Sequence, residues 1–158
     1  MSDLAQALMV AIRVHAGQTD KQGEPYLLHV LRVVEAVSDE AKVVAALHDV
    51  LEDGEGVLDI ASHDSIRALD ELDDDEEEAL SVLTRGVEEY ASYIGGIIET
   101  EGRAGRIARE VKLADLRDNL GRIPEITVET PGDEERYDGW QSLRRRYERA
   151  IATLEASS

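Results

Sequence analysis

Apolar residues recur every three or four positions along most of the chain, which is the spacing that gathers them on one face of an α-helix. Leu4, Leu8, Ala11 and Ile12 form such a stripe near the start. The pattern predicts helices over these ranges: 4–14, 25–37, 39–51, 79–84, 87–100, 104–120 and 133–156. No segment has the pattern of a strand. The sequence therefore predicts an all-α fold, in which residues 1–158 form a single compact multi-helix bundle.

The segments between these helices are polar or irregular. Residues 16–25 form a loop interrupted by glycine and proline, and residues 121–133 form another. Short helices are expected over 57–72, where the pattern does not define their ends. The acidic run DDDEEE over 73–78 predicts a solvated loop leading into a helix, since carboxylates favour helix N-termini. No linker is rich enough in Gly, Ser or Pro to indicate a second domain.

Charge and composition narrow the function classes. The chain has 35 acidic and 17 basic residues, a net charge of −18, so a general nucleic-acid binder is disfavoured. Cysteine is absent, which excludes disulfides and thiolate metal sites. No apolar stretch approaches the roughly 20 residues that span a bilayer, and the first residues do not resemble a signal peptide. We therefore expect a cytoplasmic protein without a membrane partner, and leave homo-oligomerisation open.

Polar residues interrupt three of the apolar helical patterns. His48 and Asp49 lie in VVAALHDVLED, His29 lies in PYLLHVLRVV, and Asp115 lies in VKLADLRDNL. A lone buried histidine is more commonly a hydrogen-bonded core residue. Buried charges are costly unless they share a partner, however, and a divalent cation is the simplest partner for all of them. Two histidines and two carboxylates suit manganese, iron or zinc.

The strings around these residues resemble a known family. HAGQTDKQGEPYLLHVLRV (15–33), HDVLED (48–53) and VKLADLRDNL (111–120) are similar to motifs in the hydrolase domain of the stringent-response alarmone synthetase/hydrolases. That domain belongs to the HD superfamily of metal-dependent phosphohydrolases, and small stand-alone hydrolases of guanosine tetra- and pentaphosphate share its motifs. The resemblance covers about residues 5–122, so the last helix, about 133–156, lies beyond it. It implies an all-α HD-domain fold and release of pyrophosphate from the 3′ position of a nucleotide.

The resemblance also implies roles for individual residues. Four side chains match the family's metal ligands: His29, His48, Asp49 and Asp115. Glu52 and Asp53 match the acidic pair that positions or activates the attacking water. Lys21 matches a basic residue of the substrate loop, and Asn119 matches an asparagine that contacts the substrate near its ribose. The metal implied is manganese, with iron and zinc as alternatives.

Further cations would be needed to offset phosphate charge on such an acidic protein. Arg85, in an LTR string, and Arg117 are the candidates that the sequence offers beside Lys21. Of the residues without an assigned role, His15 is expected to order the loop that follows it through hydrogen bonds. His63 is expected to be exposed.

Some positions depart from the alarmone-hydrolase pattern. Asp20 stands where the family has an arginine that helps to hold the base, Leu116 replaces another arginine, and Asp118 replaces a histidine. An aspartate at position 20 repels phosphate, so we expect weak hydrolysis of guanosine tetraphosphate. The metal chemistry is therefore better supported than the alarmone substrate.

Two kinds of alternative stay open at this point. In the first, the chain is an enzyme whose substrate is a small phosphorylated nucleotide: an alarmone, or another nucleotide such as a phosphorylated dinucleotide or a nucleoside monophosphate. In the second, the chain is a non-catalytic module that senses a nucleotide or binds a partner protein. Degenerate members of such families usually lose metal ligands or the acidic pair, whereas this chain keeps all six positions. The sequence does not decide the physiological substrate, the metal, the oligomeric state or the protein partners.

Overall fold

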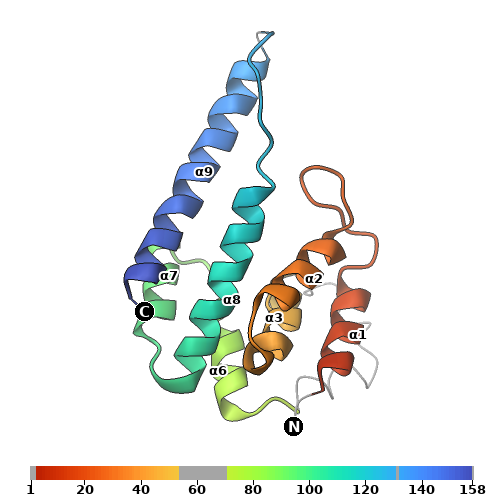
Figure 1. The fold of residues 1–158 in the computed structure, drawn as a ribbon, viewed down its shortest axis with the longest axis vertical. Coiled ribbons are helices and arrows are strands. Elements are labelled where there is room, and N and C mark those ends of the chain that lie inside the picture. Colours follow the sequence, from red (N-terminus) through yellow and green to blue (C-terminus); the bar gives the residue numbers. More distant parts are fainter. Residues whose placement is uncertain (1–2, 54–70, 131, 158) are drawn as a thin grey trace.

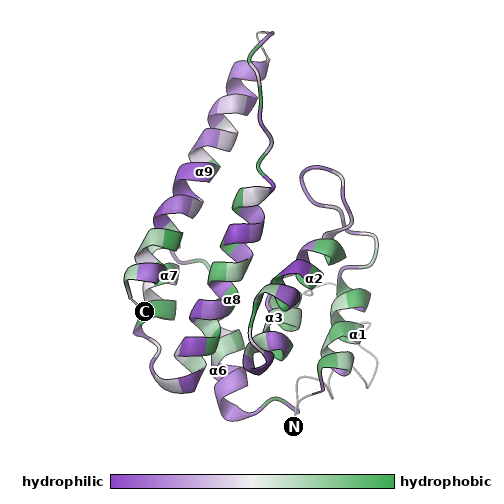
Figure 2. Cartoon of the chain, viewed as in Figure 1, coloured by the Kyte–Doolittle hydropathy of each residue, from purple (hydrophilic) through white to green (hydrophobic). Residues whose placement is uncertain are grey.

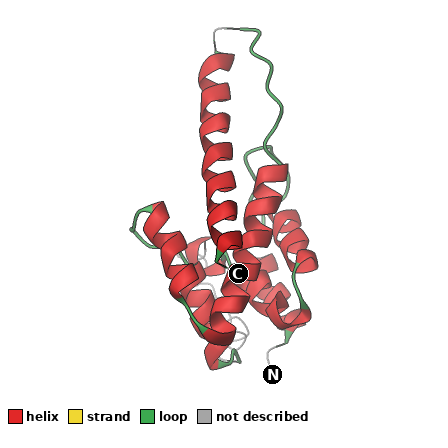
Figure 3. Cartoon of the chain, turned by 60° about the vertical axis from the view of Figure 1, so that its left-hand side comes forward, coloured by secondary structure: helices red, strands yellow, loops and turns green. Residues whose placement is uncertain are grey.

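The computed structural model describes residues 3–53, 71–130 and 132–157, and within these ranges the fold is all-α, as predicted (Figure 3). Its helices are α1 (Leu4–Val14), α2 (Tyr26–Ala36), the 3-10 turn η1 (Asp39–Ala41), α3 (Lys42–Leu47), α4 (Val50–Asp53), α6 (Asp74–Leu83), α7 (Tyr90–Glu99), α8 (Gly102–Gly121) and α9 (Asp133–Ala156). The β pairing found in the described ranges is an isolated bridge between Thr19 and Pro25. None of the described helices is long and apolar enough to cross a membrane.

Helix α8 is the central element of the bundle (Figure 1). It packs against α2, α3, α6, α7 and α9. Its buried positions include Ile107, Ala108, Val111 and Ala114, which are spaced by one, three and three residues and so form one apolar face. Asp115 follows directly on this face and is also buried. The helix therefore carries a carboxylate into the core of the bundle.

Helices α1, α2 and α3 form the other side of the core (Figure 1). Helix α1 begins at an N-cap, where the Asp3 carboxylate accepts a hydrogen bond from the Ala5 N–H at 2.8 Å. Helix α3 packs against both α1 and α2, and five of its six residues are buried. Because α3 lies in the interior, the chain is still inside the protein at His48 and Asp49, the two residues that directly follow this helix.

Helix α9 extends beyond the other helices and lies beside α8 over its second half (Figures 1 and 3). Its surface is mostly hydrophilic (Figure 2), and Ala150 and Leu154 are its buried residues. The length of the helix lets its side chains reach several parts of one face of the bundle.

The observed helices differ most from the predicted ones in two places, and the other boundaries agree to within three residues. The helix predicted over 39–51 is interrupted at His48 and Asp49, which form a turn between α3 and α4. The acidic run begins α6 itself, because Asp73 and Glu76 form a capping box in which each side chain binds the other's backbone N–H. The short helices predicted over 57–72 and the exposure predicted for His63 lie largely or wholly outside the described residues.

Candidate metal centre

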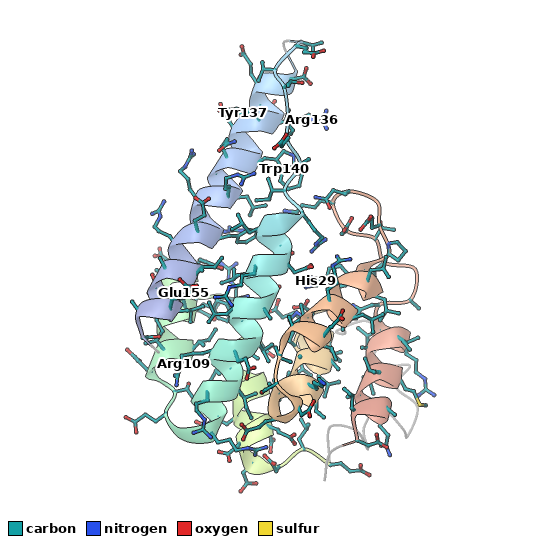
Figure 4. All side chains as sticks on the ribbon, in the orientation of Figure 1. His29, Arg109, Arg136, Tyr137, Trp140 and Glu155 are labelled. Carbon is teal, nitrogen blue, oxygen red and sulfur yellow. The ribbon has the colours of Figure 1, made fainter. Side chains whose placement is uncertain are left out.

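Three ligand atoms from three different elements meet in the core. His29 from α2, His48 from the end of α3 and Asp115 from α8 each offer one atom, and these atoms lie within 4.8 Å of one another. All three residues are buried. Figure 4 places His29 between α2 and α8. The sequence analysis predicted that these residues would converge, and this grouping is confirmed.

Hydrogen bonds orient both imidazole rings toward the cluster. The Nδ1 atom of His29 lies 2.6 Å from Asp118 Oδ2, and the Nδ1 atom of His48 lies 2.7 Å from the Ala45 carbonyl oxygen. Since these partners accept, each Nδ1 carries the hydrogen, and the lone pair is on Nε2. Both Nε2 atoms are buried without a hydrogen-bond partner. Two buried lone pairs directed at carboxylates are the donor set that a divalent transition metal prefers, so the residues fit a metal.

Asp49 is the fourth predicted ligand and lies beside this cluster. Its Oδ2 atom is 2.9 Å from His48 Nε2 and 3.7 Å from His29 Nε2. The same oxygen accepts a hydrogen bond from the Tyr26 hydroxyl. Asp49 lies with His48 in the turn between α3 and α4, where the His48 backbone keeps right-handed helical angles (φ −56°, ψ −31°).

The carboxylate of Asp115 is held from both sides. Its Oδ1 atom accepts a hydrogen bond from the Asn119 amide at 2.6 Å and lies 3.3 Å from His29 Nε2. Its Oδ2 atom accepts from Lys112 Nζ at 2.8 Å. Lys112 also lies over the Tyr93 ring, with 5.1 Å between Nζ and the ring centroid. These contacts fix the carboxylate in one orientation.

The crowded charges of the cluster shift its proton affinities. Burial disfavours the imidazolium of His48, but the negative charges of Asp49 and Asp115 outweigh burial and raise the pKa of His48 to about 9. Burial likewise opposes ionisation of Asp49, yet the His48 charge lowers the pKa of Asp49 to about 2. Burial has the same effect on Asp115, and Lys112 with the two imidazoles holds its pKa below the usual range. Without a metal, a proton on His48 compensates the carboxylates.

A pocket of about 150 Å³ opens onto the cluster. Glu52 lines it, and the carboxylate of Glu52 accepts a hydrogen bond from the backbone N–H of Arg85. Asn119 and the aromatic rings of Tyr90 and Tyr93 also line the pocket, and the two tyrosines form part of its wall. The side chain of Asp53, the second member of the predicted acidic pair, lies outside the described residues.

Two arginines line this pocket: Arg85, which follows α6, and Arg146, which belongs to α9. The guanidinium of Arg85 lies 5.4 Å from the centroid of the Tyr90 ring, and that of Arg146 lies 5.0 Å from the same centroid. Both line the pocket. The sequence analysis proposed Arg85 but missed Arg146, which comes from α9, beyond the residues that resemble the family. Nothing in the run Arg144–Arg146 distinguishes the arginine that turns toward the metal cluster.

Two further pockets continue from the first along α9. One, of about 300 Å³, shares Asn119 with the metal pocket and is also lined by Lys21 and Trp140. The next, of about 410 Å³, shares Lys21 and Trp140 and reaches Arg136. Lys21 Nζ lies 5.9 Å from the Trp140 ring centroid. Figure 4 shows Arg136 and Trp140 on the part of α9 that extends past the bundle. The pockets together form a groove whose lining includes cationic side chains and several aromatic rings.

The structure does not bring Arg117 to this groove. Its guanidinium is exposed and pairs with Glu155 of α9 at 2.7 Å. Arg117 follows Asp115 by two positions, so the two side chains point about 200° apart around α8. The predicted contact between Arg117 and the substrate therefore has no support from this geometry. Leu116 is buried in the core.

Asp20 is also placed differently from the expectation. Its side chain is only 6% exposed, and its Oδ2 atom pairs with Arg122 Nη1 at 2.6 Å. The premise that Asp20 presents an unbalanced negative charge to phosphate is wrong, because Arg122 neutralises it. By contrast, the prediction that His15 orders its loop is confirmed by a contact of 2.9 Å between His15 Nδ1 and Gln18 Oε1.

Comparisons with known proteins agree with this architecture. No known protein-family profile matches the chain. A GTP pyrophosphokinase of Myxococcus xanthus is 44% identical over 55 residues, which cover 32% of this chain and 7% of that protein. A solved structure described as a metazoan ortholog of SpoT that hydrolyses ppGpp has 23% identity and a TM-score of 0.55, covering 98% of this chain and 90% of its own. At this identity the likeness shows a shared fold.

Proposed function

We propose that this chain is a metal-dependent phosphohydrolase that removes pyrophosphate from the 3′ position of guanosine 3′,5′-bis(diphosphate) or a similar nucleotide. The observation that carries the proposal is the pair of buried Nε2 atoms of His29 and His48, which make no hydrogen bond and lie next to the carboxylates of Asp49 and Asp115. The fold shared with a protein described as hydrolysing ppGpp supports the choice of substrate class.

His29, His48, Asp49 and Asp115 would hold the metal, and manganese is the metal proposed. A divalent cation bound there would polarise a phosphoryl oxygen and lower the pKa of a nearby water. Lys112 and Asn119 keep the Asp115 carboxylate in its orientation. Asp118 and the Ala45 carbonyl oxygen do the same for the two imidazoles.

Glu52 is proposed as the general base. Glu52 lines the same pocket as His48 and Asp115, and the residue is exposed to solvent. There it would accept a proton from the attacking water as the oxygen of that water bonds to the phosphorus next to the ribose. The bond from this phosphorus to the 3′ oxygen breaks, its electron pair goes to the 3′ oxygen, which takes up a proton to become a hydroxyl group, and pyrophosphate that carries the oxygen of the water is released. Asp53 is proposed to assist on the grounds of the HDVLED string.

The cations along the groove would bind the phosphates that the acidic surface repels. Arg85 and Arg146 stand over the Tyr90 ring at the metal pocket, where a 3′ diphosphate would lie. Lys21 and Trp140 line the adjoining pocket, and an indole ring gives a purine base a face for stacking. Asn119 lines both pockets, the position expected for a contact with the ribose between them.

Hydrolysis of a small set of nucleotides with added manganese tests the proposal. The purified protein is incubated separately with guanosine tetraphosphate, a phosphorylated dinucleotide and a nucleoside monophosphate, and released pyrophosphate and orthophosphate are measured. We expect the fastest reaction with guanosine tetraphosphate, with pyrophosphate as the product. If orthophosphate were released faster from the dinucleotide or the monophosphate, that nucleotide would replace guanosine tetraphosphate as the proposed substrate. Binding of nucleotides without any turnover would make the chain a sensing module.

A further inference from the structure

A single guanidinium group joins three polar side chains beside the metal cluster. Arg122, at the C-terminal end of α8, donates from Nη1 to Asp20 at 2.6 Å, from Nε to Asp118 at 2.8 Å and from Nη2 to Asn119 at 2.6 Å. The side chains of Arg122, Asp20 and Asp118 are 16%, 6% and 13% exposed. The group is therefore largely shielded from water, and its hydrogen bonds have defined directions.

Two of these partners reach the metal cluster themselves. Asp118 accepts a hydrogen bond from His29 Nδ1, and the Asn119 amide donates one to Asp115 Oδ1. Each of these hydrogen bonds has a donor–acceptor distance of 2.6 Å. Asp118 and Asn119 are thus the direct partners of two residues proposed to bind the metal, and Arg122 holds both of these partners. Partners such as Asp118 and Asn119 set the orientation and basicity of metal ligands, and losing one typically costs about 10- to 100-fold in metal affinity or activity.

The third partner, Asp20, organises the loop over 18–25. Its Oδ1 atom accepts hydrogen bonds from the backbone N–H groups of Gln22 and Glu24, at 2.8 and 3.0 Å, and so closes the turn. Its Oδ2 atom is the one that binds Arg122. The Gln22 side chain donates to the Arg122 carbonyl oxygen as well. Gly23 completes the turn at a φ of 83°, a conformation that favours glycine.

Two of the three departures from the alarmone-hydrolase pattern, Asp20 and Asp118, belong to this one network. Asp20 and Asp118 both pair with Arg122, and Arg32 adds a second cation on Asp118, with 2.6 Å from Arg32 Nε to Asp118 Oδ1. Two aspartates and two arginines therefore balance in charge behind His29. An arginine at position 20 would instead face Arg122.

We propose that Arg122 is a positioning residue that couples the substrate loop, residues 18–25, to the metal centre through Asp118 and Asn119. The inference rests on the proposed metal site. The loop lines the pocket that adjoins the metal pocket, so a nucleotide that fixes the loop also favours the metal-binding orientation of His29 and Asp115. By the same linkage, a change in the loop that breaks the contact with Arg122 weakens metal binding.

The test measures Mn²⁺ dissociation constants by isothermal titration calorimetry of the metal-stripped chain. Asp20→Asn keeps an oxygen that can accept the turn hydrogen bonds but loses the ion pair with Arg122. We expect it to weaken Mn²⁺ binding about 10-fold, and Arg122→Ala to weaken it by about 10- to 100-fold. When Arg122 is already alanine, adding Asp20→Asn is expected to have no further effect, because the route between loop and metal is gone. Arg122→Gln, which also removes the positive charge, serves as the background instead if Arg122→Ala does not fold.

Arg103 provides the matched control. It lies at the other end of α8 and also joins carboxylates, with 2.7 Å to Glu40 and 2.8 Å to Asp73. Arg103→Ala should leave the Mn²⁺ dissociation constant unchanged. The proposal is overturned if Asp20→Asn lowers only the melting temperature and not Mn²⁺ affinity, or if its effect persists without Arg122. Failure of the wild-type chain to bind Mn²⁺ would instead overturn the metal centre itself.

Discussion

His48 and Asp49 are adjacent in the sequence, and the turn between α3 and α4 brings His48 Nε2 to 2.9 Å from Asp49 Oδ2. The Nδ1–H of the His48 ring donates a hydrogen bond to the Ala45 carbonyl oxygen. The Nε2 atom therefore either carries a proton paired with Asp49 or offers its lone pair to a metal. A proton and a metal ion compete for this one atom.

The first prediction follows from that competition. The pKa of His48 is raised from 6.5 to about 9, so the protonated form stabilises the metal-free protein fully below pH 6.5, and this contribution is lost as the pH rises to about 9. Mn²⁺ binding near pH 7.5 should release about one proton, and affinity should fall as the pH falls. Calorimetry in two buffers with different ionisation enthalpies measures the released proton. Equal heats in both buffers would contradict the assignment of His48.

Glu52 should affect the chemical step and not metal binding. Glu52→Gln removes the proposed proton acceptor while keeping a side chain of the same size, so kcat should fall by roughly 100-fold. The number of metal ions bound per chain, measured by inductively coupled plasma mass spectrometry, should not change. Glu77→Gln on the exposed face of α6 is the matched control and should behave as the wild type. Loss of metal in Glu52→Gln would make Glu52 a ligand.

Arg146 should act on substrate binding. Arg146→Ala removes one of the two guanidinium groups over Tyr90, so KM for guanosine tetraphosphate should rise by about 10-fold, with a smaller change in kcat. Steady-state kinetics at a fixed ionic strength gives both values. Arg145→Ala changes the charge equally at an exposed neighbouring position and should leave KM within about twofold. Equal effects of the two variants would reduce the role of Arg146 to general electrostatics.

The fold class and the convergence of His29, His48 and Asp115 could be predicted because both depend on local pattern. Helical periodicity is visible in any window of the chain, and a polar residue on an apolar face stands out against it. The break at 48–49 could not be predicted in this way, since the apolar periodicity continues across it. The direction of Arg117 could not be predicted either, because its place in the sequence gives its order along α8 but not which neighbours its side chain meets.

The surroundings of the site depend on contacts between distant segments. Arg122 meets Asp20 across 102 positions, and Asp118 meets His29 across 89. Arg146 belongs to a helix whose placement against α8 is set by packing. No local window contains both partners of such a pair. Asp20 therefore looked like a lone negative charge in the sequence, whereas the fold gives it a cation.

Asp20→Arg, the substitution toward the alarmone-hydrolase pattern, should destabilise the fold without improving substrate binding. It places a second guanidinium against Arg122 and removes the carboxylate that closes the turn at Gln22 and Glu24. The free energy of unfolding should fall by about 1–3 kcal/mol, and KM should not improve. Denaturant unfolding and kinetics measure these two quantities. A lower KM at unchanged stability would mean that Asp20 acts on the substrate directly, as its sequence position suggested.

The central claim is that His29, His48, Asp49 and Asp115 hold a metal on which hydrolysis depends. The most direct test is to strip the protein with a chelator and follow pyrophosphate release from guanosine tetraphosphate while Mn²⁺ is added back. We predict no release from the stripped protein, and activity that rises to saturation at about one Mn²⁺ per chain, in the wild type but not in His48→Ala. Full activity without metal, or saturation of activity by Mn²⁺ in His48→Ala at the wild-type stoichiometry, would contradict it.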